Sequence, residues 1–266
     1  MLRPSFLLPA AFLAALALPA AARSESLVVD SGDFSVSIRG QKIGREKFAM
    51  IVAGDSLVVQ ARSVQTLPGA DVGGTDLRVE KEMGTVTNSF DFGLHHYVSR
   101  QMVHSDTLVR GVEATETDTL YSVFRELNHE GEGDRLVLPP GRLFVIDSPP
   151  LFATFNVICR TLHGKQFDRR PLSLLLLGAR DTVLEVTVTD LGTEPIRWGS
   201  RPVTARKLSI GDSTTQFLAW VAPTGKMLRL QQPQTGLRVE RDPAKVSAKP
   251  PAKRAAAKRP AGARAR

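Results

Sequence analysis

The chain has 266 residues, 42% of them apolar, so it is neither wholly disordered nor collagen-like. Its 35 Lys and Arg residues against 27 Asp and Glu residues give a formal net charge of +8. The last 23 residues, 244–266, contain eight basic residues and no acidic one, which leaves 27 residues of each sign elsewhere. The basic character therefore belongs to a tail, and the body has no excess charge that would indicate a nucleic-acid-binding surface.

The first 22 residues have the layout of a secretory signal peptide. Arg3 supplies the positive end, Phe6–Leu18 the apolar stretch, and Ala20 and Ala22 the small residues of an A-x-A cleavage site. A retained membrane anchor is the alternative, but the apolar stretch is shorter than the roughly 20 residues that a spanning helix needs. We expect cleavage after residue 22, export to the periplasm or the medium, and no transmembrane span in the mature chain.

Residues 23–243 are predicted to form one β-rich domain. Apolar residues alternate with polar ones from Phe34 to Ile38, the period of a half-buried strand, and Phe48, Met50 and Val52 share one face of a second strand. Further stretches of strand character lie at 57–66, 75–83, 86–92, 95–103, 107–114, 119–127, 171–177, 182–189, 195–198, 203–210, 215–222 and 226–232. Short turns between them predict antiparallel neighbours, because parallel pairing needs crossovers of a dozen or more residues.

One helix is predicted in the body, at 150–162. Phe152, Phe155 and Ile158 recur at helical spacing, and Gly164 marks the end. So apolar a helix must lie against the sheet. Cys159 follows the same pattern and is expected to be a small core residue; as the only cysteine, it excludes a disulfide within the chain.

About a dozen consecutive strands form too long a meander for a flat open sheet, which tends to curl, split or close. With one helix midway, the pattern predicts a mainly β fold: a single strongly curved antiparallel meander sheet, or half-barrel, with the helix on its concave side. A closed β-barrel and a β-sandwich are the alternatives. The firmest local prediction is a hairpin at the turn Ala222–Gly225, which has proline second and glycine fourth.

Three stretches of the body resemble a known group of proteins. They are Phe34–Gly40 with Ile43–Phe48, Thr193–Ile196 with Pro202–Leu208, and Ala219–Val221 with Gly225–Arg229. The group consists of bacterial envelope proteins of unknown function whose domain is similar to the lipoprotein-localisation-factor and glycolipid-binding half-barrels. The resemblance implies a curved sheet wrapped around an apolar groove and a helix, and an exported, lipid-related role. It brings no catalytic residue.

Two functional hypotheses follow. The first is a binding protein that holds a lipid or other apolar ligand between the sheet and the helix, with a packed core as the alternative reading of the same residues. The expected groove residues are Phe48, Met50, Phe152, Phe155, Ile158, Phe217 and Trp220. The second is an envelope scaffold or interaction protein that is anchored electrostatically by its basic tail.

The tail, residues 244–266, is predicted to be disordered, because its prolines interrupt any helix and its like charges repel. Its charges are Lys245, Lys249, Lys253, Arg254, Lys258, Arg259, Arg264 and Arg266. Anionic envelope polymers or lipid headgroups are the expected partners, and a solubilising tail without a partner is the alternative. The absence of aromatic residues for base stacking argues against nucleic acid.

Catalytic motifs are missing from the sequence. It contains no G-x-S-x-G elbow, no phosphate-binding G-x-x-x-x-G-K-S/T loop, no G-x-G-x-x-G run and no H-E-x-x-H zinc helix. His95 and His96 point to opposite faces of a strand, so with His104 they indicate ordinary strand histidines and no metal site. The sequence therefore predicts no enzyme, no cofactor and no metal.

Overall fold

One sheet of fifteen strands makes up most of the part that the computed structural model describes, residues 26–115, 119–138, 143–212 and 215–243. The strands are β1 (Leu27–Ile38), β2 (Gln41–Ala53), β3 (Ser56–Leu67), β4 (Leu77–Asn88), β5 (Leu94–Val103), β6 (Asp106–Ala114), β7 (Leu120–Leu127), β8 (Glu130–Val137), β9 (Leu143–Asp147), β10 (Arg169–Leu177), β11 (Thr182–Trp198), β12 (Arg201–Gly211), β13 (Gln216–Val221), β14 (Met227–Gln232) and β15 (Leu237–Arg241). They are joined by one α-helix, α1 (Ala153–Thr161), and a 3-10 turn, η2 (Val72–Gly74). The predicted mainly β class with one helix is confirmed in this part of the chain.

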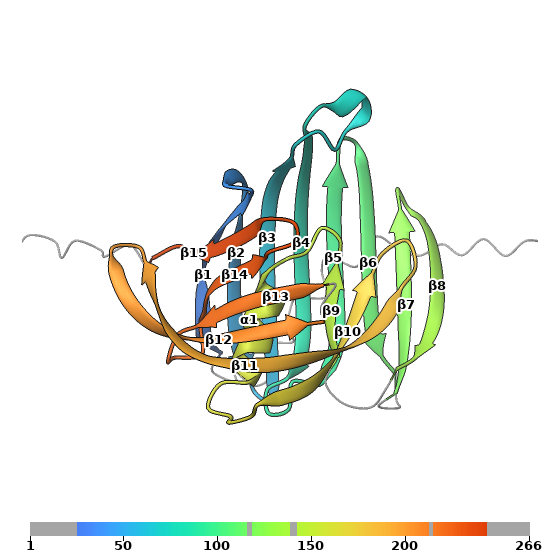
Figure 1. Cartoon of the computed structure of the whole chain (residues 1–266). Coiled ribbons are helices and arrows are strands. Elements are labelled where there is room, and N and C mark those ends of the chain that lie inside the picture. Colours follow the sequence, from blue (N-terminus) through green and yellow to red (C-terminus); the bar gives the residue numbers. More distant parts are fainter. Residues whose placement is uncertain (1–25, 116–118, 139–142, 213–214, 244–266) are drawn as a thin grey trace, which may run out of the picture.

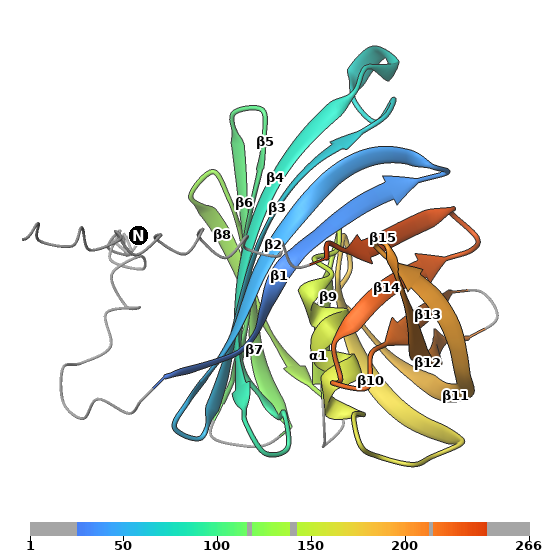
Figure 2. The ribbon, with the colours of Figure 1, turned by 90° about the vertical axis from the view of Figure 1, so that its left-hand side faces the viewer.

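The sheet has two halves that meet at the first and last strands. Strands β1 to β8 follow one another on one side, β15 back to β9 follow on the other, and β1 pairs with β15. In this central pair Ile38 lies opposite Leu237 and Phe34 opposite Arg241. The two halves curve toward each other with α1 between them (Figures 1 and 2). The predicted curved sheet with a helix on its concave side is therefore confirmed.

The sheet does not close. Its edge strands are β8 and β9, and no pairing joins them in the described residues. β9 runs parallel to β10, with Leu143 opposite Ser173, so the expectation of purely antiparallel pairing is wrong at this edge. The segment 148–168, which contains α1, provides the long crossover that a parallel pair requires.

Three strands, β8, β9 and β15, were not predicted from the sequence. β8 is exposed along almost its whole length, so its glycines and acidic residues show no apolar alternation. β15 has only two apolar residues, Leu237 and Val239, between charged ones. The predicted strand at 195–198 is the end of β11, which bends at a register shift between Asp190 and Thr193.

The concave faces and α1 share one core. Every residue of α1 except Arg160 is buried, and the rings of Phe34 and Phe48 stack in the same core with centroids 4.8 Å apart. A second, smaller cluster lies on the opposite face of the second half and contains Ile196, Ala205, Trp220 and Leu228. The helix therefore packs as predicted, and the outer face of β11–β14 has an apolar core of its own.

The predicted closing hairpin is also confirmed. The Gly225 N–H donates to the Ala222 carbonyl at 2.9 Å, closing the turn between β13 and β14. Gly225 has a φ of 82°, and a Cβ there would lie 2.8 Å from the His163 ring. Glycine thus allows both the turn and the close approach of the segment that follows α1.

Candidate functional site

Six of the seven predicted groove residues come together around α1. Phe48 and Met50 of β2 and Phe152, Phe155 and Ile158 of the helix region are at most 2% exposed. Phe217 of β13 packs against them, with its ring centroid 4.7 Å from that of Phe155.

Trp220 does not join these six residues, because it belongs to the cluster on the opposite face. Its indole N–H donates to Glu194 Oε1 at 2.5 Å. Trp220 is three residues from Phe217 on the same strand, and residues an odd number of positions apart point to opposite faces. The strand period alone therefore predicts that these two rings do not meet.

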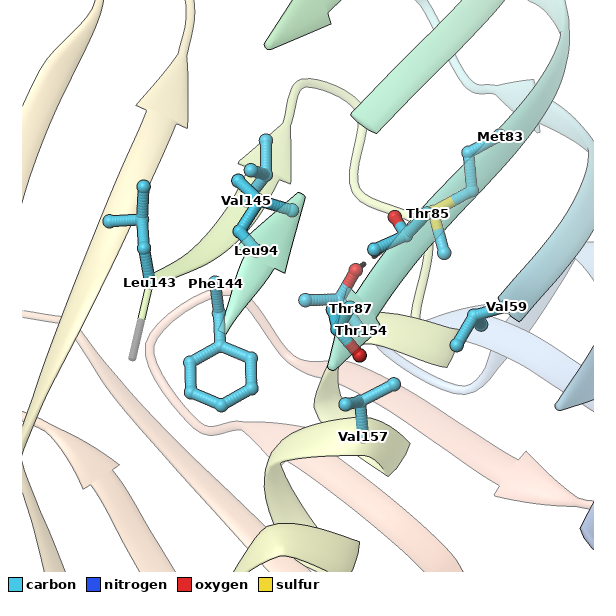
Figure 3. A pocket seen from close by; sticks show the side chains of 10 residues that line it. All are labelled: Val59, Met83, Thr85, Thr87, Leu94, Leu143, Phe144, Val145, Thr154 and Val157. Atoms are coloured by element: carbon cyan, nitrogen blue, oxygen red, sulfur yellow. Dashed lines mark hydrogen bonds between the residues drawn. The ribbon is translucent and has the colours of Figure 1, made fainter. Parts of the chain in front are cut away.

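The space between the helix and the first half is filled. A cavity of about 20 Å³ remains between β9, α1 and β3–β5, and Figure 3 shows the ten side chains around it. Three of them are Thr85, Thr87 and Thr154, and the Thr87 hydroxyl is buried without a hydrogen-bond partner among the described residues. Such a volume accommodates about one water molecule, which is too little for an apolar ligand.

A larger pocket of about 280 Å³ lies at the C-terminal end of α1. Its lining residues are Cys159, Leu162, His163, Gly164, Thr193, Thr204, Arg206, Leu208, Val221, Ala222 and Pro223. Leu162 and Leu208 are buried in its apolar floor, and Thr193 and Thr204 are exposed at its rim. This volume is just below the roughly 300–1,000 Å³ that is usual for small-molecule sites.

Local sequence explains why the pocket forms there. β12 pairs with β13 only as far as Arg206 opposite Val221, so its segment Arg201–Ala205 runs on beyond the end of β13. On the other side α1 ends at Thr161, and Gly164 turns the chain away with a φ of 72°. The inner face of β12 therefore extends past the helix that covers the rest of the concave surface.

Arg206 forms one wall and is held from three sides. Its Nε donates to Asp190 Oδ2 at 2.9 Å and its Nη2 lies 2.8 Å from the same carboxylate. Its Nη1 donates to the Leu162 carbonyl at 3.3 Å, and its guanidinium lies 4.7 Å from the centre of the Phe167 ring. These contacts fix the position of Arg206, which is the one Lys, Arg, Asp or Glu residue among the lining residues named above.

Two pKa values describe the chemistry of the pocket. Burial acts to raise the pKa of Asp190, but hydrogen bonds from Arg206 and the Gly192 N–H outweigh it and hold that pKa below its ordinary value. Burial raises the pKa of the Cys159 thiol to about 12. Cys159 is thus a neutral core residue, as predicted, and the Asp190–Arg206 pair is ionised.

The concave face also contains buried polar residues that the sequence analysis did not predict. Glu46 is fully buried, and its two carboxyl oxygens accept the N–H groups of Phe152 and Ala153, each at 2.7 Å, at the start of α1. Burial raises the pKa of Glu46 to about 8 against the opposing effect of these hydrogen bonds. The available signal was a charged residue on the apolar phase of β2, two residues from Phe48.

A second buried group ties the two halves together. Asp147, at the end of β9, lies 2.9 Å from Lys81 Nζ, accepts the Ser99 hydroxyl at 2.5 Å and forms an ion pair with Arg110. Lys81 also donates to the Pro149 carbonyl at 2.9 Å. Burial lowers the pKa of Lys81 to about 8, although Asp147 acts in the opposite direction. Lys81 again occupies the apolar phase of its strand, two residues from Met83.

A third buried group joins α1 to the central strands. Asp30 of β1 accepts hydrogen bonds from Arg241 of β15 at 2.5 and 3.0 Å and from the Asn156 amide of α1 at 2.9 Å. The Asn156 carbonyl oxygen accepts the Met227 N–H at 2.9 Å. These contacts fix the helix relative to β1, β14 and β15 and so hold its C-terminal end beside β12.

The described residues contain neither a metal-binding cluster nor a helix that could span a membrane. Within the described ranges, no three His, Cys, Asp or Glu side chains are grouped so that they could bind a metal. His104 of the β5–β6 turn instead lies 2.9 Å from Asp71. No helix of the described residues has the length and apolar character needed to span a membrane. The predicted signal peptide and the basic tail lie outside these residues.

Comparison with known proteins gives a likeness in fold. No family model and no curated protein matches the chain. Among solved structures, the chain is similar to a beta-barrel-like protein of a domain of unknown function, DUF1849, from Brucella abortus. The two share 9% sequence identity with a TM-score of 0.48 over 81% of this chain and 97% of the other. The likeness supplies no activity, ligand or partner for this chain.

Proposed function

We propose that this protein is an exported binding protein that holds an apolar small molecule or lipid in the pocket at the C-terminal end of α1. The observation that supports this function most directly is the pocket of about 280 Å³ with its floor of Leu162, Leu208 and Val221. An apolar concavity with a few polar groups at its rim is the usual form of a ligand site. The proposal keeps the ligand between sheet and helix, but places it at the helix end, away from the filled interior.

Titration with the neutral fluorescent probe N-phenyl-1-naphthylamine tests the proposal. The wild-type protein is expected to bind the probe saturably with increased fluorescence. Thr204 lines the pocket at its exposed rim, so Thr204→Phe is expected to fill part of the volume and to weaken binding at least tenfold.

The matched control is Thr66→Phe, which adds the same ring at an exposed position of β3 away from the pocket. This variant is expected to bind like the wild type. Absence of saturable binding, or equal binding by both variants while circular dichroism shows both to be folded, contradicts the proposed site.

The basic tail supports a second function, electrostatic association with anionic envelope surfaces. Eight Lys and Arg residues without a carboxylate occur in residues 244–266, and each basic residue near an anionic bilayer contributes about 1 kcal/mol. Deletion of 244–266 is expected to abolish cosedimentation with phosphatidylglycerol vesicles at low salt. Thermal unfolding of the body should stay unchanged. Association that survives the deletion, or that persists in 0.5 M salt, would contradict a role of the tail.

A further inference from the structure

Arg206 in the pocket wall bears on which ligand charge the pocket accepts. An arginine at the wall of an apolar pocket usually indicates a carboxylate or phosphate ligand, because its planar fork matches these anions. Here the fork is already occupied, since Nε and Nη2 both contact Asp190, at 2.9 and 2.8 Å. The guanidinium in the pocket wall therefore forms an ion pair with Asp190 that has no net charge.

The end of α1 adds a second electrostatic contribution. Leu162, His163 and Gly164, which follow the last helical residue, line the pocket. The C-terminal end of a helix carries a partial negative charge from its unpaired carbonyl groups. Arg206 Nη1 donates to the Leu162 carbonyl at this end at 3.3 Å, and the same oxygen accepts the Lys165 N–H at 3.3 Å. Asp190 and the helix end together thus oppose the charge of Arg206.

Arg206 also has little freedom to leave this position. It stacks on Phe167 at 4.7 Å, and Asp190 is itself fixed because its Oδ1 accepts the Gly192 N–H at 2.9 Å in the bend of β11. A ligand anion would have to compete with a preformed carboxylate for the same donors. The hydroxyl-bearing side chains Thr193 and Thr204 and the exposed imidazole of His163 complete the polar part of the lining.

We infer that the pocket selects uncharged apolar molecules with a hydroxyl or carbonyl group, that it rejects anions of the same length, and that Asp190 is the residue that determines this specificity. The inference rests on the proposed function, because it concerns the ligand of the same pocket. Asp190 acts by engaging Arg206, so it is a positioning residue. Without its charge, Arg206 would become available to a ligand carboxylate.

Displacement of N-phenyl-1-naphthylamine by three eight-carbon probes tests the inference at pH 7. We expect 1-octanol to displace the dye best from the wild type, and octylammonium to displace it better than octanoate. Octylammonium and octanoate have equal chain length and opposite charge. Both are disfavoured by the cost of burying a charge, so a difference between them reports whether the electrostatic potential in the pocket favours cations or anions. In Asp190→Asn, octanoate is expected to gain at least tenfold and to overtake octylammonium, while 1-octanol changes less than twofold.

Glu185→Gln is the matched control, because it removes one negative charge from an exposed position of the same strand. It is expected to keep the wild-type order. Octanoate displacing the dye better than octylammonium from the wild type overturns the inference while leaving the proposed function intact. The wild-type comparison does not depend on the folding of any variant. An unchanged order in folded Asp190→Asn overturns the role of Asp190, whereas failure of the dye to bind at all overturns the proposed function itself.

Discussion

Asp147→Ala is expected to lower the free energy of unfolding by about 3–5 kcal/mol, the usual cost of removing one partner from a buried ion pair. The Asp147 and Lys81 side chains are each only 2% exposed, and Arg110 shares the same carboxylate. Loss of Asp147 would leave the buried Lys81 and the partly buried Arg110 without their counter-charge. Urea denaturation followed by circular dichroism measures the effect.

Asp242→Ala provides the control for this prediction. Asp242 pairs with Arg45, whose side chain is 53% exposed, so water screens the interaction. Its removal is expected to cost less than about 1 kcal/mol. Equal losses in the two variants would show that the Asp147 group does not hold the halves of the sheet together.

Stability is expected to fall by about 3 kcal/mol as pH rises from 5 to 8, because of Glu46. The pKa of this carboxyl is about 8 in the fold, against an ordinary 4.5. Between these values the folded state keeps a proton that the unfolded state releases, so rising pH favours unfolding. The carboxyls with lowered pKa values, such as Asp30 and Asp190, change stability at more acidic pH. Lys81, with its pKa lowered to about 8, acts in the opposite direction from about pH 8 upward, because the folded state then loses a proton that the unfolded state keeps.

Glu46→Gln separates this contribution from all others. The variant keeps the size of the side chain but has no titrating group, so its stability should be nearly constant between pH 5 and 8. At pH 5 it should be less stable than the wild type by about 1 kcal/mol, because its amide nitrogen cannot accept a helix N–H. Urea denaturation at pH 5, 6, 7 and 8 measures both effects. A wild-type slope in Glu46→Gln would assign the pH dependence to another group.

The predictable part of this fold is the part with a strong local period. The alternation at Phe34–Ile38 and the helical spacing of Phe152, Phe155 and Ile158 identified elements that the structure contains. The pairing of β1 with β15 was not predicted, because it joins residues about 200 positions apart and no local pattern encodes it. β9 was also not predicted; its parallel partner β10 lies about 30 positions further along the chain, after α1.

The site was less predictable than the fold. Apolar residues at regular spacing identify the core, and six of the seven predicted groove residues are core residues or pack against them. The larger pocket depends instead on where α1 ends and how far β12 runs past β13. Such lengths follow from three-dimensional packing. Glu46 and Lys81 are charged residues at positions of their strands where an apolar residue is expected, and this was the sequence signal for the buried polar contacts of the interior.

The central position of β1 also has a consequence for how the chain folds. Strands β1 to β8 can form by successive hairpins between neighbours in sequence, but β1 gains its second partner only when β15 arrives, with Phe34 opposite Arg241. Until then the half-formed sheet has two open edges, at β1 and at β8. An open edge is a template for pairing with another chain, and distant pairings form slowly. The edge of β1 is therefore open to mispairing with another chain until the final strand, β15, is in place.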